Sequence, residues 1–289
     1  MNLKILVTGG LGYIGSHVVV ELLKEGFGVV IIDNLSNSTI EVLDRIAAIS
    51  GTKPQFENLD LKNKSSVTAF FQKHPDIDGV IHFAAFKAVG ESVNIPLTYY
   101  ENNINSLIFI LQELIKKQKA DFIFSSSCTV YGQADELPVT ESAPVKAAES
   151  PYGNTKQIGE EIIRDCCKVS SGLNAISLRY FNPIGAHQSA KIGELPIGTP
   201  QNLVPFITQT GIGLREQLSV FGNDYPTADG TCIRDYIHVV DLAIAHISAL
   251  KRLINKENDD NYEVFNIGTG KGSSVLEVIH AFEEVTGQK

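Results

Sequence analysis

From residue 4 to about residue 180, short apolar runs alternate with longer stretches of helical period. The run Val29-Val30-Ile31-Ile32 is β-branched throughout, which is typical of a strand buried on both faces of a sheet. Because parallel strands need crossover helices, the alternation predicts a doubly wound parallel sheet. We expect strands at residues 4–7, 28–33, 55–58, 79–83, 122–125 and 175–179, and helices at residues 14–24, 64–74, 97–118 and 151–169.

The pattern changes after Phe181. Residues 182–235 are rich in Gly, Pro, Asn and Thr and predict loops with short elements. A helix at 239–254, a strand at 264–267 and a helix at 275–285 follow. The chain therefore predicts an α/β fold with a Rossmann domain over residues 1–181 and a smaller C-terminal α/β substrate domain over residues 182–289. Some C-terminal elements could pack back on the Rossmann domain, and the smaller domain is expected at the carboxyl edge of the sheet, where ligands bind.

One predicted helix contains five consecutive apolar residues, which together cover its whole circumference. Residues 107–111, within the helix expected at 97–118, are all apolar, so this helix needs burial on more than one face. One face is expected on the sheet, and the other could meet the smaller domain or a second subunit. The helix at 151–169 also carries an apolar stretch, at Ile158, Ile162, Ile163 and Cys166. We expect a homodimer formed through these two helices.

The net charge, the apolar runs and the spacing of cysteines and histidines each disfavour particular partners, locations or sites. The formal net charge of −9 disfavours nucleic acid and anionic lipid as partners. We find neither an apolar run long enough to cross a membrane nor the basic segment and cleavage site of a signal peptide. The cysteines, Cys128, Cys166, Cys167 and Cys232, show no C-x-x-C spacing, and the histidines show no metal-ligand spacing. We expect a cytoplasmic protein with reduced cysteines and no metal.

A glycine-rich segment, Gly9-Gly10-Leu11-Gly12-Tyr13-Ile14-Gly15, joins the first predicted strand to the first predicted helix. Glycine permits a tight turn and a close approach of the backbone to a diphosphate, and the helix N-terminus offers free N–H groups to the phosphates. Asp33 ends the second predicted strand, where a carboxylate accepts the hydroxyls of the adenosine ribose and repels a 2′-phosphate. The combination predicts binding of NAD rather than NADP.

Tyr152 and Lys156 form a candidate acid–base pair. Ser150 and Pro151 suit the start of a helix, so Tyr152 and Lys156 are expected one turn apart on the same helix face. The preceding strand ends in three serines, the last of which, Ser127, is expected to donate a hydrogen bond to the same substrate oxygen. A free phenol has a pKa of about 10, and we expect the Lys156 ammonium and a cationic nicotinamide to lower it. The pair predicts redox chemistry on a hydroxyl group.

With these motifs, the chain resembles the extended short-chain dehydrogenase/reductase superfamily and, within it, the UDP-glucose 4-epimerase family. The glycine loop and the Tyr-x-x-x-Lys pair carry the first resemblance. Longer segments carry the second, at residues 9–17, 33–38, 82–92, 125–132, 178–186, 222–227 and 234–239, and the resemblance as a whole covers essentially the whole chain.

The resemblance implies a role for each matching residue. Tyr152 would be the base, with Lys156 and Ser127 assisting. Asp60 would meet the adenine and Lys87 the nicotinamide-side ribose. The cofactor-binding set would be Gly9, Gly12, Tyr13, Ile14, Gly15, Asp33, Asn34, Leu35, Ser36, Asn37, Ser38, Asp60, Leu61, Phe83, Ala84, Ala85, Phe86, Lys87, Asn102, Tyr152, Lys156 and Phe181. The substrate-binding set would be Lys87, Ser127, Tyr152, Asn182, Asn202, Leu203, Ser219, Phe221 and Arg234.

Two of these roles have a direct physical sense. Phe221 offers a face for uracil, and Arg234 can form a forked contact with a diphosphate. For Phe221 and Leu203, ordinary core packing remains an equal alternative.

The implied reaction is the interconversion of UDP-galactose and UDP-glucose by transient oxidation at sugar carbon 4, with tightly bound NAD and no net redox change. In the family the chain continues past Lys289 with an Arg and an Asp that hold UDP, so we expect a truncated chain. Two alternatives stay open. A nucleotide-sugar 4,6-dehydratase would need an Asp-Glu pair where this chain has Cys128-Thr129. An inactive, truncated NAD-binding module would need no intact catalytic pair.

Overall fold

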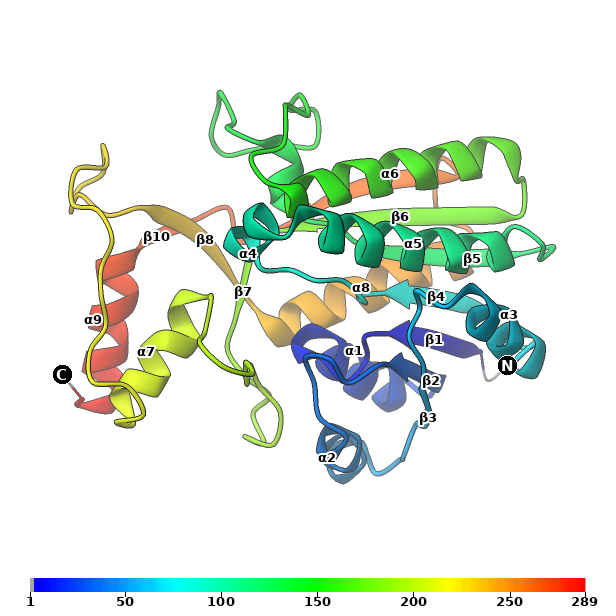
Figure 1. Cartoon of the computed structure of the whole chain (residues 1–289), viewed down its shortest axis with the longest axis horizontal. Helices are drawn as coiled ribbons and strands as arrows, with labels where there is room; N and C mark the ends of the chain where they lie inside the picture. The colour runs from blue at the N-terminus through cyan, green and yellow to red at the C-terminus, as the bar shows by residue number, and fades with distance from the viewer. Residues whose placement is uncertain (1–2, 289) are drawn as a thin grey trace.

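The computed structural model describes residues 3–288, and a parallel sheet forms its centre (Figure 1). Within these residues the sheet has seven strands in the order β3-β2-β1-β4-β5-β6-β9. The order runs outward in both directions from β1 and β4, so the doubly wound parallel fold is confirmed. The strands are β1 (Lys4–Thr8), β2 (Gly28–Asp33), β3 (Gln55–Asn58), β4 (Gly79–His82), β5 (Ala120–Ser125), β6 (Leu173–Tyr180) and β9 (Tyr262–Ile267).

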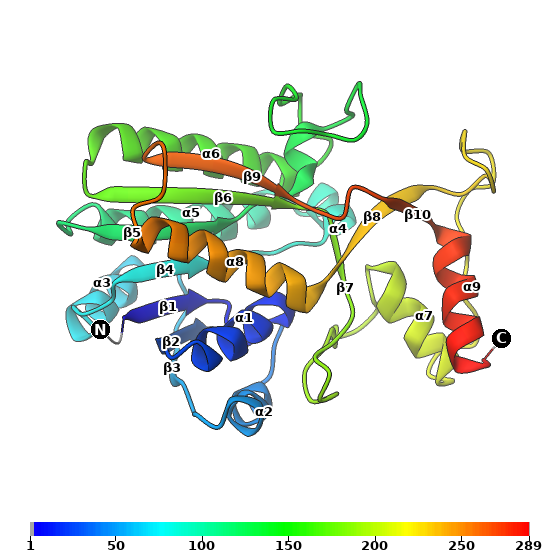
Figure 2. The same cartoon turned by 180° about the vertical axis from the view of Figure 1, so that it is seen from behind.

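Helices cover both faces of this sheet (Figures 1 and 2). Strand residues alternate between two apolar cores: Ile5 and Val7 point to one, and Leu6 between them points to the other. The first core lies under α1 (Tyr13–Lys24), α2 (Glu41–Ser50) and α8 (Val239–Ile254). The second lies under α3 (Lys64–Lys73), α5 (Pro96–Leu114) and α6 (Pro151–Val169). A short helix, α4 (Val89–Asn94), precedes α5.

A smaller unit lies at one end of the large sheet (Figure 2). Its three strands pair in the order β10-β8-β7, and they are β7 (Asn182–Ile184), β8 (Ile233–His238) and β10 (Gly272–Ser274). Two helices accompany them, α7 (Leu203–Gly211) and α9 (Val275–Thr286). By contrast, α8 and β9 pack back on the large sheet, β9 pairing with β6. The smaller unit is therefore interrupted in sequence, and a division of the chain near residue 181 stays a prediction.

Candidate active site

The glycine loop forms the floor of a cleft at the carboxyl ends of β1, β2 and β4. The cleft has a volume of about 370 Å³. Gly9 has a φ of +66°, and a Cβ on Gly15 would lie 2.3 Å from the Gly9 carbonyl oxygen, so both positions require glycine. Helix α1 begins directly afterwards and directs its N-terminus toward the cleft. This backbone can approach a diphosphate closely, as a dinucleotide site requires.

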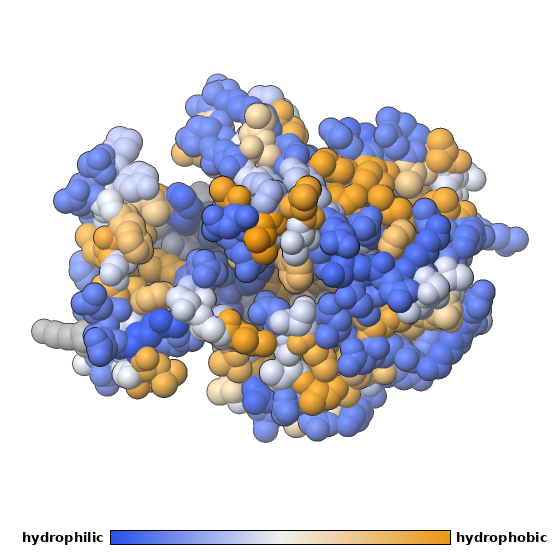
Figure 3. Space-filling view, viewed as in Figure 1, coloured by the Kyte–Doolittle hydropathy of each residue, from blue (hydrophilic) through white to orange (hydrophobic). Residues whose placement is uncertain are grey.

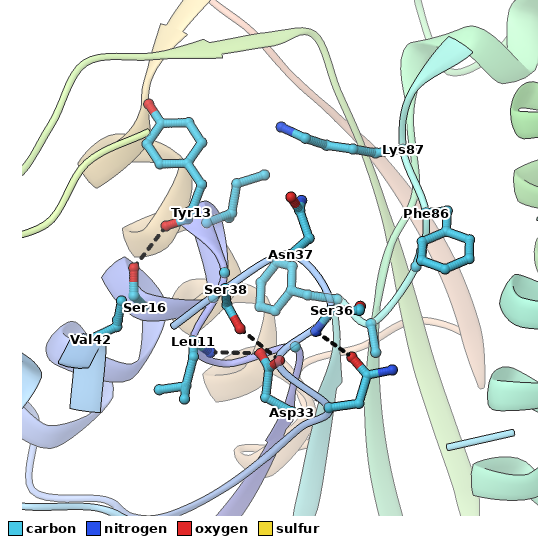
Figure 4. Close-up of a pocket in the computed structure, with 18 of the residues that line it drawn as sticks. Leu11, Tyr13, Ser16, Asp33, Ser36, Asn37, Ser38, Val42, Phe86 and Lys87 are labelled. Carbon is cyan, nitrogen blue, oxygen red and sulfur yellow. Dashed lines mark hydrogen bonds between the residues drawn. The ribbon is translucent and has the colours of Figure 1, made fainter. Parts of the chain in front are cut away.

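Asp33 organises the neighbouring loop as well as facing the cleft (Figure 4). Its carboxylate accepts hydrogen bonds from Leu11 N at 3.1 Å, Leu35 N at 2.9 Å and Ser38 Oγ at 2.8 Å. A carboxylate has about four acceptor positions, so about one is left for a ribose hydroxyl. The negative charge at this point still disfavours a 2′-phosphate, in agreement with a preference for NAD.

The opposite wall is the segment after β4, which includes Phe86 and Lys87. The side chain of Asn103 accepts from Phe86 N at 2.8 Å and donates to Phe86 O at 3.0 Å, which fixes the path of this segment. Lys87 Nζ lies 3.0 Å from an oxygen of Glu194, and Asn202 Nδ2 donates to the same oxygen at 2.6 Å. Glu194 therefore joins one predicted cofactor residue to one predicted substrate residue. The sequence did not single it out, because it lies in an aperiodic loop.

Tyr152 and Lys156 line the cleft from the first turns of α6. The side chain of Ser150 caps this helix by accepting from Gly153 N at 3.1 Å, as the sequence predicted. Lys156 Nζ lies 5.8 Å from the centroid of the Tyr152 ring and donates to the Ser125 carbonyl oxygen at 2.7 Å. Both side chains are buried. The helix thus presents a phenol and an ammonium to the same part of the cleft.

Burial shifts the pKa values of Tyr152 and Lys156 in opposite directions. It raises the pKa of the Tyr152 phenol far above its ordinary value, and a hydrogen bond with Ser127 only partly opposes this. Burial lowers the pKa of Lys156 to about 8, opposed by the negative charge of Glu160. The expected lowering involves Lys156 together with a cationic nicotinamide, so it stays a prediction for the protein with NAD bound. In the protein alone, the loss of hydration on burial outweighs the hydrogen bond with Ser127, and the Lys156 ammonium is bonded to the Ser125 carbonyl oxygen.

Most predicted cofactor residues come together in the cleft. The lining includes the glycine loop, Asp33, Asp60, residues 83–87 and Asn102. Leu35 and Phe181 lie outside the lining: Leu35 packs against the core beneath α1 and α2, and Phe181 packs beside Gly268. Ser127 also lies outside it but contacts Tyr152.

The remaining predicted substrate residues lie in the smaller unit. Asn182 is on β7, Asn202 and Leu203 begin α7, and Arg234 is on β8. Ser219 and Phe221 lie in the loop that follows α7, where Phe221 is 85% exposed. The Arg234 guanidinium donates to the Ile233 carbonyl oxygen at 2.7 Å. The structure therefore gathers Lys87 and Tyr152 in the cleft and distributes the other substrate candidates over an adjacent surface.

Residues 3–288 contain neither a candidate metal site nor a candidate membrane-spanning helix. No group of three or more His, Cys, Asp or Glu side chains there is arranged to hold a metal ion. In the same residues, no helix combines the length and the apolar character needed to cross a membrane.

Comparison with known proteins decides the family. The sequence profile of the NAD dependent epimerase/dehydratase family matches residues 5–268. The chain belongs to this family. Its glycine loop, Asp33 and the Tyr152/Lys156 pair all fall within the matched residues.

The similarity to curated relatives spans nearly the whole chain. A UDP-glucose 4-epimerase of Bacillus subtilis (strain 168) is 50% identical over 287 residues, which are 99% of this chain and 83% of the relative. The UDP-glucose 4-epimerase of Mus musculus is 48% identical over 292 residues, with the same two coverages. These comparisons do not confirm the expectation of a truncated chain.

Solved structures agree with the fold. A UDP-glucose-4-epimerase from Stenotrophomonas maltophila with bound NAD and formylated UDP-arabinopyranose superposes with a TM-score of 0.94 at 49% identity. An epimerase from Bifidobacterium longum in complex with NAD+ and UDP gives a TM-score of 0.93 at 43% identity. Each similarity covers 99% of this chain and 84% of the solved one.

Proposed function

We propose that this protein interconverts UDP-galactose and UDP-glucose by transient oxidation at sugar carbon 4, using tightly bound NAD. The observation that carries the proposal is the buried Tyr152/Lys156 pair beside a glycine-loop cleft suited to NAD. The chain around this pair is 50% identical to a UDP-glucose 4-epimerase over 287 residues.

In this proposal the chain holds the cofactor and moves a proton. The glycine loop and the α1 N-terminus would hold the diphosphate, Asp33 the adenosine ribose and Lys87 the second ribose. When bound, NAD supplies reversible acceptance of the hydrogen at sugar carbon 4 and a positive charge near Tyr152. Tyr152 takes the proton of the 4-hydroxyl group and later returns it. Lys156 stabilises the phenolate, and Ser127 orients the reacting oxygen.

The smaller unit would hold the UDP part of the substrate. Arg234 is suited to the diphosphate, and Phe221 offers its exposed ring to uracil. Asn182, Asn202, Leu203 and Ser219 would complete this surface. A substrate anchored mainly through UDP leaves the sugar free to turn, which presentation of both faces of carbon 4 requires.

We also propose that the protein is a cytoplasmic homodimer. The free cysteines Cys128, Cys166, Cys167 and Cys232 suit a reducing compartment. Apolar side chains gather over the face that α5 and α6 form (Figure 3). On this face Ile108 and Ile158 remain only half-buried. A second copy of the same helix pair would cover them.

The dehydratase alternative lacks its chemistry here. At the position of the required acid, Cys128 follows Ser127, and burial raises the pKa of this thiol to about 11. A neutral thiol of this kind is poorly suited to a proton-coupled elimination of water.

The test is to incubate the purified protein with UDP-galactose and separate the nucleotide sugars by chromatography. We expect UDP-glucose to form without added cofactor. Tyr152→Phe should retain NAD but lose about 10²–10⁴-fold in turnover, because only the proton acceptor is removed. Formation of a 4-keto-6-deoxy sugar would support the dehydratase reading, and absence of any product would support the inactive module.

A further inference from the structure

A buried ion pair lies behind the catalytic residues, and the mechanism above does not use it. Glu160 on α6 and Arg179 on β6 have side chains only 3% and 5% exposed. The contact is bidentate, with Nε 2.9 Å and Nη2 2.5 Å from the two carboxylate oxygens. Transfer of two charges into a protein interior is costly, and an apolar pair of similar volume often stabilises a fold at least as well. The pair therefore calls for an explanation beyond stability.

The Glu160 end of the pair holds the residue that precedes Ser127. Glu160 continues the helix face that carries Tyr152 and Lys156, one turn further on. It accepts a hydrogen bond from Ser126 Oγ at 2.5 Å, while Ser126 N donates to the Leu178 carbonyl oxygen at 2.9 Å. Ser126 is thus attached to α6 through its side chain and to β6 through its backbone.

The Arg179 end holds the segment that follows Ser127. A short 3₁₀ helix, η1 (Cys128–Tyr131), begins directly after this serine. Arg179 Nη1 donates to the Tyr131 hydroxyl at 2.9 Å, and that hydroxyl donates to Asn266 Oδ1 at 2.6 Å. At the start of η1, Ser127 Oγ accepts from Thr129 N at 3.2 Å. The last residue of η1 is therefore tied to the same ion pair as Ser126.

We propose that the Glu160–Arg179 pair positions Ser127 for the reaction, by anchoring the chain on both sides of it. Because Glu160 belongs to the helix of Tyr152 and Lys156, the same contact fixes the register between Ser127 and the acid–base pair. Glu160 and Arg179 are positioning residues, since they act through Ser126 and Tyr131 rather than on the substrate. The inference rests on the proposed role of Ser127 in epimerisation.

The test removes the two anchors and leaves the ion pair intact, because loss of one charge would leave the other buried and unpaired. Ser126→Ala and Tyr131→Phe each delete one hydrogen bond to the pair. We expect the double variant to lose about tenfold or more in kcat for UDP-galactose, since a displacement of about 1 Å at a reacting group can cost about 10²-fold. Tyr262→Phe is the matched control. It deletes a tyrosine hydrogen bond to Ser177 on β6 but leaves both anchors, Ser126 and Tyr131, bonded to the ion pair, and should keep kcat within about twofold.

The deciding measurement repeats the double substitution in a Ser127→Ala background. If the anchors act through Ser127, their removal should change kcat by less than about twofold there. A merely structural role would give the same fold-loss in both backgrounds, and that result would overturn the inference while leaving the proposed function intact. A parent protein that does not convert UDP-galactose at all would overturn the proposed function itself.

Discussion

Burial of the Lys156 ammonium group at the catalytic site lowers the free energy of unfolding of the protein. The pKa of this buried side chain is lowered to about 8, so at neutral pH the folded protein holds a charge that the unfolded chain would hold more easily. Below pH 8 both states carry the proton and the cost is complete. Between about pH 8 and 10.5 only the unfolded state carries it, so stability rises with pH across this window.

We therefore predict that Lys156→Met is more stable than the parent at pH 7, by roughly 2–3 kcal/mol, but turns over UDP-galactose more slowly. Its pH optimum should also move upward, because the phenolate loses its nearest cation. Thermal unfolding at pH 7 and pH 10 checks the stability, and the gain should shrink at the higher pH. A variant less stable than the parent at pH 7 would show that the hydrogen bond to Ser125 outweighs the burial of charge.

Single residues differ in how far sequence could predict them. Asp33 and Gly15 were recognisable because their roles depend on the backbone that immediately surrounds them. Glu194 was not, because its two partners are distant in sequence and it lies in a loop without a period. The pKa of Tyr152 also depends on burial by elements that the local sequence does not specify.

At the scale of elements, the residue that caps α6 lies next to the first turn, which carries the catalytic tyrosine. Ser150 caps the helix in whose first turn Tyr152 lies. We predict that Ser150→Ala costs about 1 kcal/mol of stability and also lowers turnover several-fold, because fraying of the cap displaces Tyr152. Asn63→Ala is the matched control. Asn63 caps α3, which carries none of the catalytic side chains, by accepting from Ser66 N at 3.1 Å, so its loss should reduce stability with unchanged turnover in the NAD-loaded protein. Equal turnover in the two variants would contradict this coupling.

The exposed apolar face of α5 and α6 predicts an assembly defect when it is charged. Ile158→Glu should shift a dimer to monomers in sedimentation at micromolar concentration, because the interface would have to bury an unpaired carboxylate. The control is Ile244→Glu on α8, which lies on the opposite face of the sheet and is 48% exposed. A parent protein that sediments only as a monomer would contradict the proposed dimer.

The sequence predicted helices and strands correctly where the periodicity of its apolar residues was strong. The alternation of β-branched runs and helical stretches correctly predicted strands β1 to β6. It also predicted the helices between them, except α2 and α4. The helix at 97–118 ends earlier, at Leu114, because β5 begins at Ala120 and the chain must turn first. Helix α7 was not predicted as a separate element, because residues 182–235 are rich in Gly, Pro, Asn and Thr. Its Pro205 lies in the first turn, where proline is tolerated.

At the scale of the whole molecule, three buried histidines make the protein less stable as the pH falls. Burial lowers the pKa of His17 and His246 to about 4 and that of His82 to about 3. As the pH falls below the ordinary histidine pKa of 6.5, these histidines bind protons in the unfolded chain but stay neutral in the folded protein. Each group should then remove about 1.4 kcal/mol of stability per pH unit.

We predict that the melting temperature falls steeply between pH 6.5 and pH 4, and that His246→Phe makes the fall shallower. His246 is the suitable site because it lies against the rings of Phe83 and Tyr180, which can pack on another aromatic ring. Parallel pH profiles for the parent and the variant would show that His246 titrates normally.

The arrangement of the two units could be predicted only in part. The carboxyl edge of the sheet was the expected ligand site because parallel α/β sheets bind ligands there. The sequence allowed some C-terminal elements to pack back on the Rossmann domain but did not single out β9, since a short apolar strand fits either unit. The surface around Phe221 and Arg234 depends on loops of irregular sequence, for which no periodic signal exists.

The central claim is that carbon 4 of the sugar is oxidised and reduced within one site. The most direct test uses UDP-galactose deuterated at that carbon, incubated with purified protein without added cofactor, and mass spectrometry of the product. The account predicts UDP-glucose that keeps its deuterium at carbon 4, because the same hydrogen is removed and returned. A UDP-glucose that carries solvent hydrogen at carbon 4 would contradict it.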